Sequence, residues 1–349
     1  MIAGYSASIR LGLAVGLMLA CAMLCAEPGP NDTRYLYKGK DRDEKLVDLA
    51  KKEGRLVLYT SLAPTESQPL AQAFEKKYGI KVEVWRGLSD KVVQRVVTET
   101  QARRYGFDVV ETNGPEMEMM SRERVFSEFH SPHLADLPPS AIPSHRLWMP
   151  DRLNFFVVAF HTGKIRREDV PKTYEGFLDA KWKSKLGLEA TDAEWMAALT
   201  KKWGADRGGA FFRQLAAMNP DMRKGHILLA ELVGAGEVPV ALTCYQANIE
   251  TMKRKGAPID WLPVEPVIGR PQGIAVAKFA QHPNAALLFA DFVLSVEGQE
   301  KFNAMGRAPA NARVKTRLAD FPYTMTDPGI IIDESARWEK QWNELFLRK

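Results

Sequence analysis

Short β-prone runs alternate along the chain with segments of helical periodicity. The run 55–60 is rich in Leu, Val and Tyr, and the segment after it places Leu70, Phe74 and Tyr78 at intervals of four. The same alternation repeats with strands predicted at 81–85 and 107–112 and a helix between them. Strands and helices that alternate at this spacing predict βαβ units and a mostly parallel sheet. We therefore expect an α/β fold.

The most β-prone segment, 153–160, lies near the middle of the chain. It can carry the backbone out of one lobe into a second, which has its own predicted strands and helices. A later strand at 273–278 can return the chain, so two crossings form a hinge. The predicted boundaries are a signal peptide at 1–26, a flexible lead-in at 27–42, lobe 1 at 43–157, lobe 2 at 158–268, the return part of lobe 1 at 269–320 and a helical C-terminal segment at 321–349.

The N-terminus has the pattern of an export signal. Arg10 precedes an uncharged apolar run at 11–26, and a weakly basic start before such a run is typical of a secretory signal. The run is shorter than the roughly 20 apolar residues of a membrane-spanning helix. Residues 18–21 also resemble a degraded lipoprotein box, so a lipid anchor at Cys21 is the alternative to cleavage.

Charge, cysteines and motifs exclude several classes of protein. The net charge is +5 and the charges are interspersed, which gives no support to nucleic-acid binding. If cleavage follows the apolar run, only Cys244 remains, and a disulfide framework or a cysteine metal cluster is excluded. The common hydrolase, zinc-protease and nucleotide-binding motifs are absent. We expect no cofactor and no enzymatic activity; a secreted hydrolase or transferase is the remote alternative.

Two histidines close in sequence, His130 and His133, raise the question of a metal site. Pro132 breaks the helix that would hold both imidazoles on one face. Solvated loop residues are therefore the better interpretation, and the sequence predicts no metal site here.

The predicted sheet places a ligand site without any motif. In parallel α/β sheets, ligands bind beyond the carboxyl ends of the strands, where helix N-termini favour anions and carbonyl oxygens. The polar residues that follow the first three strands should line one crevice: Thr60, Ser61, Arg86, Ser89, Thr112 and Asn113. Capping of the following helices is the alternative role for the Ser, Thr and Asn residues.

Ordered segments over about residues 54–315 carry a family likeness. They include 54–61, 74–81, 170–179, 232–237, 273–277 and 294–299. Together they resemble periplasmic substrate-binding proteins of ABC importers, in the type 2 fold, within the group that binds ferric iron and small anions. The resemblance implies a two-lobed Venus-flytrap fold with mixed sheets flanked by helices. It also implies a monomer that captures a solute in the periplasm and delivers it to a membrane permease and its ATPase.

The resemblance bears on the ligand as well. Iron-binding members clamp the metal with tyrosinate oxygens, often from a Tyr-Tyr pair, and the matching segment here offers Tyr245 alone. Hydroxyl-rich loops with one tyrosine, and Arg86, suit a carboxylate, phosphate or phosphonate. Ferric iron, with Tyr245 as a ligand, is the alternative. Asp192 and Trp195 lie where the second lobe of such proteins often contributes to the ligand site. Tyr245 could instead be a core or hinge residue, and Trp195 could serve packing.

Overall fold

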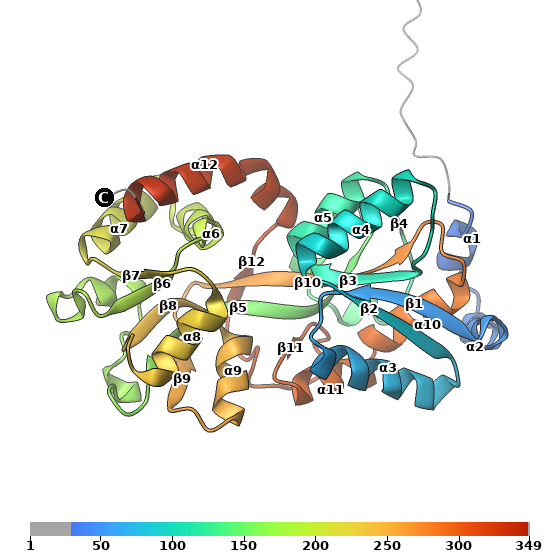
Figure 1. Ribbon diagram of the computed structural model, residues 1–349, viewed down its shortest axis with the longest axis horizontal. Helices are drawn as coiled ribbons and strands as arrows, with labels where there is room; N and C mark the ends of the chain where they lie inside the picture. The colour runs from blue at the N-terminus through green and yellow to red at the C-terminus, as the bar shows by residue number, and fades with distance from the viewer. Residues whose placement is uncertain (1–28, 348–349) are drawn as a thin grey trace, which may run out of the picture.

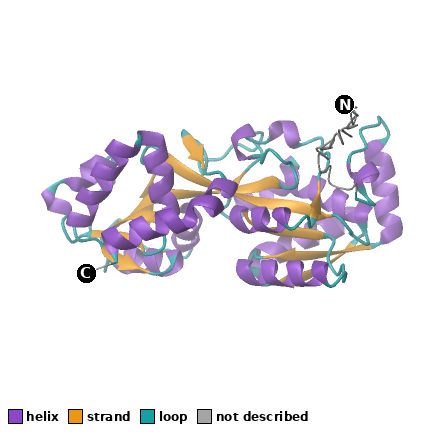
Figure 2. Cartoon of the chain, turned by 90° about the horizontal axis from the view of Figure 1, so that it is seen from above, coloured by secondary structure: helices purple, strands orange, loops and turns teal. Residues whose placement is uncertain are grey.

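Two long antiparallel strands, β5 (Met149–His161) and β10 (Val267–Ala277), run through the middle of the molecule and join two lobes (Figure 1). The computed structural model describes residues 29–347, so the predicted signal peptide lies outside the described residues. All strands belong to one mixed sheet, whose main path is β2-β1-β3-β10-β5-β8-β6-β7. Seen from above, strands extend through both lobes with helices around them (Figure 2). The two-lobed α/β fold predicted from the sequence is confirmed.

Lobe 1 contains the βαβ units that the sequence predicted. Its strands β1 (Arg55–Thr60), β2 (Lys81–Arg86) and β3 (Val109–Asn113) are parallel, and β10 lies antiparallel beside β3. Its other elements are α2 (Arg42–Glu53), α3 (Pro64–Tyr78), α4 (Ser89–Gln101), α5 (Gly114–Arg122), β4 (Phe126–Ser127), α10 (Pro283–Leu294), α11 (Val296–Ala304) and β11 (Ala308–Pro309).

Lobe 2 repeats this plan on the other side of the central strands. Strands β8 (Val240–Tyr245), β6 (Leu186–Glu189) and β7 (Asp221–Arg223) are parallel, and β8 lies antiparallel to β5. Its other elements are α6 (Ala193–Trp203), α7 (Ala205–Ala217), α8 (His226–Ala235), α9 (Gln246–Arg254) and β9 (Ile259–Leu262). Short 3₁₀ helices lie at Leu134–Asp136, Pro139–Ala141, Arg167–Asp169, Tyr174–Leu178 and Ala180–Trp182.

The alternation of side chains along β5 determines where the apolar core stops. Phe156, Val158 and Phe160 point to one face and belong to the core of lobe 2, because successive strand residues face opposite sides. On the same face, two and four positions earlier, stand Asn154 and Arg152. The core of lobe 2 therefore gives way to polar side chains at the centre of the sheet, between the lobes.

The chain crosses between the lobes a third time. After β11 it runs along the central strands, where β12 (Tyr323–Met325) pairs with β10, and then forms α12 (Pro328–Phe346). Helix α12 packs on α6 and α7 of lobe 2, and it also contacts α5 of lobe 1. Its Trp342 and Phe346 belong to the core of lobe 2. The sequence predicted two crossings and a separate C-terminal segment; the boundaries between lobes stay a prediction.

The lead-in differs from the flexible segment that the sequence predicted. Residues 29–41 contain α1 (Asp32–Tyr35), and Tyr35 is fully buried. Its hydroxyl donates a hydrogen bond to the Ala277 carbonyl over 3.0 Å. The amide of Asn31 donates to the Ala280 carbonyl over 3.2 Å. These two hydrogen bonds hold the segment on lobe 1. Asn31 and Tyr35 are not part of a periodic pattern, so the sequence alone did not indicate the contacts. Among residues 29–347, no helix is long and apolar enough to cross a membrane.

Candidate functional site

A cavity of about 450 Å³ lies between the lobes, where strand ends and helix starts converge. Lobe 1 contributes residues that follow β1 and β2 and the last residue of β3, and lobe 2 contributes the end of β8 and the first residues of α8. Polar side chains of β5 and β10 line it from the hinge. We call this cavity the cleft. It occupies the place at which parallel strands direct their carboxyl ends, as expected for a ligand site.

The lobe 1 wall of the cleft consists of small polar side chains. Thr112 Oγ1 donates a hydrogen bond to Ser61 Oγ over 2.9 Å, and Asn113 Nδ2 donates to Ser89 Oγ over 2.7 Å. Each serine thus accepts one bond and keeps its own hydroxyl proton to donate. Asn113 makes no side-chain capping bond, although it stands at the N-cap of α5. These side chains therefore form a surface of hydrogen-bond donors beside helix N-termini.

Arg152 and Gln272 of the two hinge strands also line the cleft. The Arg152 guanidinium is buried and pairs with Glu111 and, over 3.0 Å, with Asp151. It also donates to Gln272 Oε1 over 2.7 Å. Burial raises the pKa of the Asp151 carboxyl, although Arg152 acts in the opposite direction. A buried charge cluster thus holds the guanidinium at the junction of the lobes.

The lobe 2 wall is a stack of side chains around Tyr245. The His226 ring lies against the Tyr245 ring with centroids 3.5 Å apart. On the hydroxyl side, Arg270 donates a hydrogen bond to the Tyr245 oxygen, and its Nε lies 3.1 Å from Glu194 Oε2. Burial raises the pKa of Tyr245 well above its ordinary value, and the nearby Arg270 only partly offsets this. Tyr245 is therefore a phenol whose own proton can be donated to a ligand oxygen.

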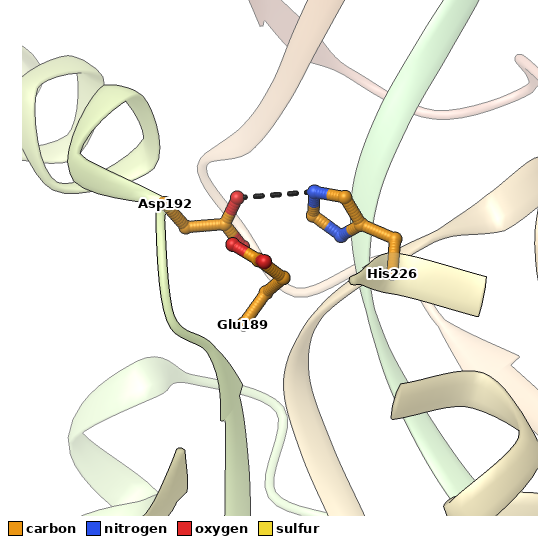
Figure 3. A group of neighbouring side chains, drawn as sticks. All are labelled: Glu189, Asp192 and His226. Atoms are coloured by element: carbon orange, nitrogen blue, oxygen red, sulfur yellow. Dashed lines mark ion pairs between the residues drawn. The ribbon is translucent and has the colours of Figure 1, made fainter. Parts of the chain in front are cut away.

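A buried ion pair between His226 and Asp192 lies behind this wall (Figure 3). His226 Nε2 is 3.2 Å from Asp192 Oδ1, and His226 Nδ1 donates to the Thr243 carbonyl over 3.0 Å. Burial by itself lowers the pKa of His226, but the Asp192 carboxylate outweighs it, and the net shift is upward. Glu189 stands beside the pair. The imidazole is thus fixed from behind.

The arginines that line the cleft are held by carboxylates. Arg307 pairs with Glu66 at the cleft, as Arg152 does with Glu111 and Arg270 with Glu194. These pairs fix the guanidinium groups in place and reduce the net positive charge of the cleft. The cleft therefore suits a ligand that accepts several directed hydrogen bonds, as oxyanions do.

Comparison with known proteins identifies the family. Residues 69–326 match the family described as bacterial extracellular solute-binding protein, which is well over half of the chain. The chain belongs to this family. In such a two-lobed protein, the cleft between the lobes is the natural place for the solute.

Individual relatives are distant in sequence. The major ferric iron-binding protein of Neisseria meningitidis is 22% identical over 273 residues, which cover 74% of this chain and 82% of that protein. The iron-bound HitA of Pseudomonas aeruginosa has a TM-score of 0.70 at 22% identity, over 82% of this chain and 99% of that one. AfuA of Actinobacillus pleuropneumoniae with fructose-6-phosphate has a TM-score of 0.65 at 22% identity, over 84% and 99%. Likeness at this identity shows the fold alone.

Four of the residues predicted from sequence meet at the cleft of this solute-binding protein: Ser61, Ser89, Asn113 and Tyr245. Thr60 and Thr112 lie fully buried behind Ser61. Asp192 is buried behind His226. Ligand contact by any of these residues stays a prediction.

Two predicted residues lie elsewhere. Arg86 is exposed at the end of the sheet-edge strand β2 and is not among the residues that line the cleft. Trp195 is fully buried, with its ring centroid 5.4 Å from that of Tyr174 and 5.3 Å from that of Phe212. It stands in the first turn of α6, on the side that faces the core of lobe 2. Packing is therefore its role in this structure.

Sequence reasoning missed Arg152, Arg270 and His226. Arg152 carried a usable signal, because an Asp-Arg pair interrupts an otherwise apolar strand. Arg270 and His226 carried none, since each stands in a segment without motif or periodicity. Arg270 is placed by strand pairing between distant parts of the chain, opposite Asn154, and the His226 ring is held by the Thr243 carbonyl of β8.

Proposed function

We propose that this protein captures a small anionic solute, a carboxylate, phosphate or phosphonate, between its lobes. The observation that supports this most strongly is the facing of two donor surfaces across one cleft, the Ser61 and Ser89 wall and the Tyr245–Arg270 wall. A ligand shifts an opening equilibrium only if it contacts both lobes. An oxyanion that accepts bonds from both walls would meet that condition and favour closure around it.

Ferric iron is the second candidate, because relatives such as the N. meningitidis protein are described as binding it. The donor set argues against iron. Among the described residues that line the cleft, the only tyrosine is Tyr245 and the only carboxylate is Glu66, and an arginine pairs with each. A hard trivalent cation prefers several ionised oxygens, and the arginines already occupy the oxygens that Tyr245 and Glu66 offer. The same groups favour an anion.

We also propose that the chain is exported through residues 1–26 to the periplasm. There it works as a monomer that passes its solute to an ABC permease and its ATPase. The family assignment supports a binding role outside the cytoplasm. A lipid anchor at Cys21 is the alternative to a free periplasmic protein.

The test is thermal melting and titration calorimetry with inorganic phosphate, methylphosphonate, a sugar phosphate, a dicarboxylate and a ferric salt. We expect one of the anions to raise the melting temperature, and Tyr245→Phe to weaken its binding about tenfold. Tyr59→Phe is the matched control. The Tyr59 hydroxyl donates a hydrogen bond of 3.1 Å to Glu99, and Tyr59 does not line the cleft. A coloured ferric complex that disappears in Tyr245→Phe, with no anion bound, would replace this proposal by iron binding.

A further inference from the structure

We propose that Glu189, Asp192 and His226 form a binding site for one divalent transition-metal ion, with Zn²⁺ as the representative ion. The site lies within lobe 2, behind the Tyr245 wall. It goes beyond the proposed capture of an anion, because none of these side chains is needed to assign that function. The sequence predicted no metal site apart from the iron alternative at Tyr245, and His226 lies far along the chain from Glu189 and Asp192.

Two segments of lobe 2 bring the groups together, the connection from β6 to α6 and the start of α8 (Figure 3). Glu189 ends β6, Asp192 precedes α6, and His226 begins α8. One ligand atom from each lies within 4.8 Å of the other two. Ligands of one tetrahedral zinc ion lie roughly 3 to 3.5 Å apart, given bonds of about 2.0–2.2 Å. Small side-chain rotations therefore suffice to close the set around an ion.

The histidine is oriented as a metal ligand. His226 Nδ1 donates its proton to the Thr243 carbonyl over 3.0 Å, so the neutral imidazole carries its lone pair on Nε2. That nitrogen faces Asp192 Oδ1 at 3.2 Å. A backbone carbonyl that accepts from one ring nitrogen is the usual arrangement around a ligating histidine. A metal ion on the other nitrogen would take the place of the proton that Nε2 shares with Asp192.

The two carboxylates are held in place and can still accept further bonds. Asp192 is 4% exposed, and its Oδ2 is buried with no hydrogen-bond partner. Glu189 is 2% exposed and accepts bonds from the Thr191 hydroxyl over 2.7 Å and the Gly225 amide over 2.8 Å. These donors hold the Glu189 side chain and leave it further lone pairs. An unpartnered buried carboxylate oxygen is costly, and a cation would relieve that cost.

The charges point to a divalent ion with nitrogen and oxygen ligands. Two carboxylates stand against one imidazole, so a neutral His226 leaves two negative charges for the ion to balance. One imidazole with two carboxylates suits zinc and its neighbours in the first transition row. Metal binding would displace any proton held on His226 Nε2, and the proton would pass to solvent.

All three ligands belong to lobe 2, and this decides the role of the ion. A ligand that touches one lobe only cannot favour closure. The ion is therefore a resident of the lobe and not the transported solute. Because the His226 ring stacks on Tyr245, a metal on Nε2 would hold the imidazole firmly beneath the phenol at the cleft.

The test begins with the mature protein, without the predicted signal peptide. It is treated with EDTA and then titrated with ZnCl₂ by calorimetry. We expect one equivalent to bind and raise the melting temperature. Asp192→Asn and His226→Gln should each weaken zinc binding at least tenfold. His282→Gln is the matched control, because His282 pairs with Asp108 at 2.9 Å but belongs to no three-ligand group among the described residues. It should bind zinc like the wild type.

Co²⁺ in place of zinc provides a signal that does not depend on stability. The visible absorption of bound cobalt should appear in the wild type and be lost in Asp192→Asn. Circular dichroism of the metal-free variants shows whether they fold. Absence of stoichiometric binding in the wild type, or undiminished binding in folded Asp192→Asn, would overturn the proposal.

Solution scattering separates this proposal from the proposed function. Zinc should leave the radius of gyration unchanged, whereas an anionic solute should reduce it. A contraction caused by zinc alone would overturn the assignment of the ion as a resident of lobe 2. Failure of every anion to bind would leave the zinc result intact, so the two proposals fail independently.

Discussion

The two walls of the cleft present donors to oxygen by different means. On lobe 1, Ser61 directly follows β1 and Ser89 is the first residue of α4, so their placement follows from the backbone. On lobe 2, Tyr245 is held by His226 on one face and Arg270 at its hydroxyl. The first wall consists of separate groups, and the second consists of coupled ones. We therefore expect substitutions to have additive effects on lobe 1 and coupled, larger effects on lobe 2.

The largest effect is expected at the hinge, where the two walls meet. Arg152→Met removes the partner of Glu111 and Asp151, both buried. Leaving buried carboxylates unpaired lowers the free energy of unfolding by about 3–5 kcal/mol. Urea denaturation measures this. Arg166→Ala is the control, because Arg166 forms only exposed pairs and should change stability by less than about 0.5 kcal/mol. A loss under 1 kcal/mol in Arg152→Met would show that the buried cluster does not hold the hinge.

The next effect tests the coupling on lobe 2. Arg270→Gln breaks the ion pair with Glu194 and the bond to Tyr245. Affinity for the captured anion should fall about 10- to 100-fold, because a charged hydrogen bond is lost and the phenol is released. Calorimetry on Arg270→Gln, Tyr245→Phe and the double variant measures the coupling. Strictly additive losses would contradict the coupled wall.

The smallest effects test the independence of the lobe 1 wall. Ser61→Ala and Ser89→Ala should each weaken anion binding about three- to tenfold, since each removes one neutral donor. In the double variant, the fold-loss in affinity should equal the product of the two single losses. Arg86→Ala should leave affinity unchanged, because Arg86 does not line the cleft. A strong loss in Arg86→Ala would mean that closure brings β2 to the solute.

The sequence could predict the lobe 1 wall because a regular pattern produces it. Alternation of strands and helices places Ser61, Ser89 and Asn113 at one edge of a sheet, whatever their side chains do. The lobe 2 wall depends on contacts between distant segments, such as Arg270 of the return strand with Glu194 of α6. Trp195 illustrates the limit. It stands one residue after Glu194, but the rotation of the helix turns it into the core.

The same contrast appears in the overall fold. Periodicity predicted two lobes and a long central strand, since these depend on runs of residues. It did not predict the anchoring of Tyr35, which depends on a single hydrogen bond, or the third crossing, which depends on the pairing of the short strand β12 with the distant strand β10. Family likeness supplied the role of the protein but not the solute, because the solute depends on individual side chains.

Small-angle X-ray scattering with and without the bound solute tests the central claim most directly. The probe is the anion that gives the largest thermal stabilisation, added at saturating concentration to the mature protein. Capture between two lobes predicts a smaller radius of gyration with the anion, and a weaker response at the same concentration in Arg270→Gln. An unchanged radius at proven saturation would contradict capture by closure and would place the solute on one lobe only.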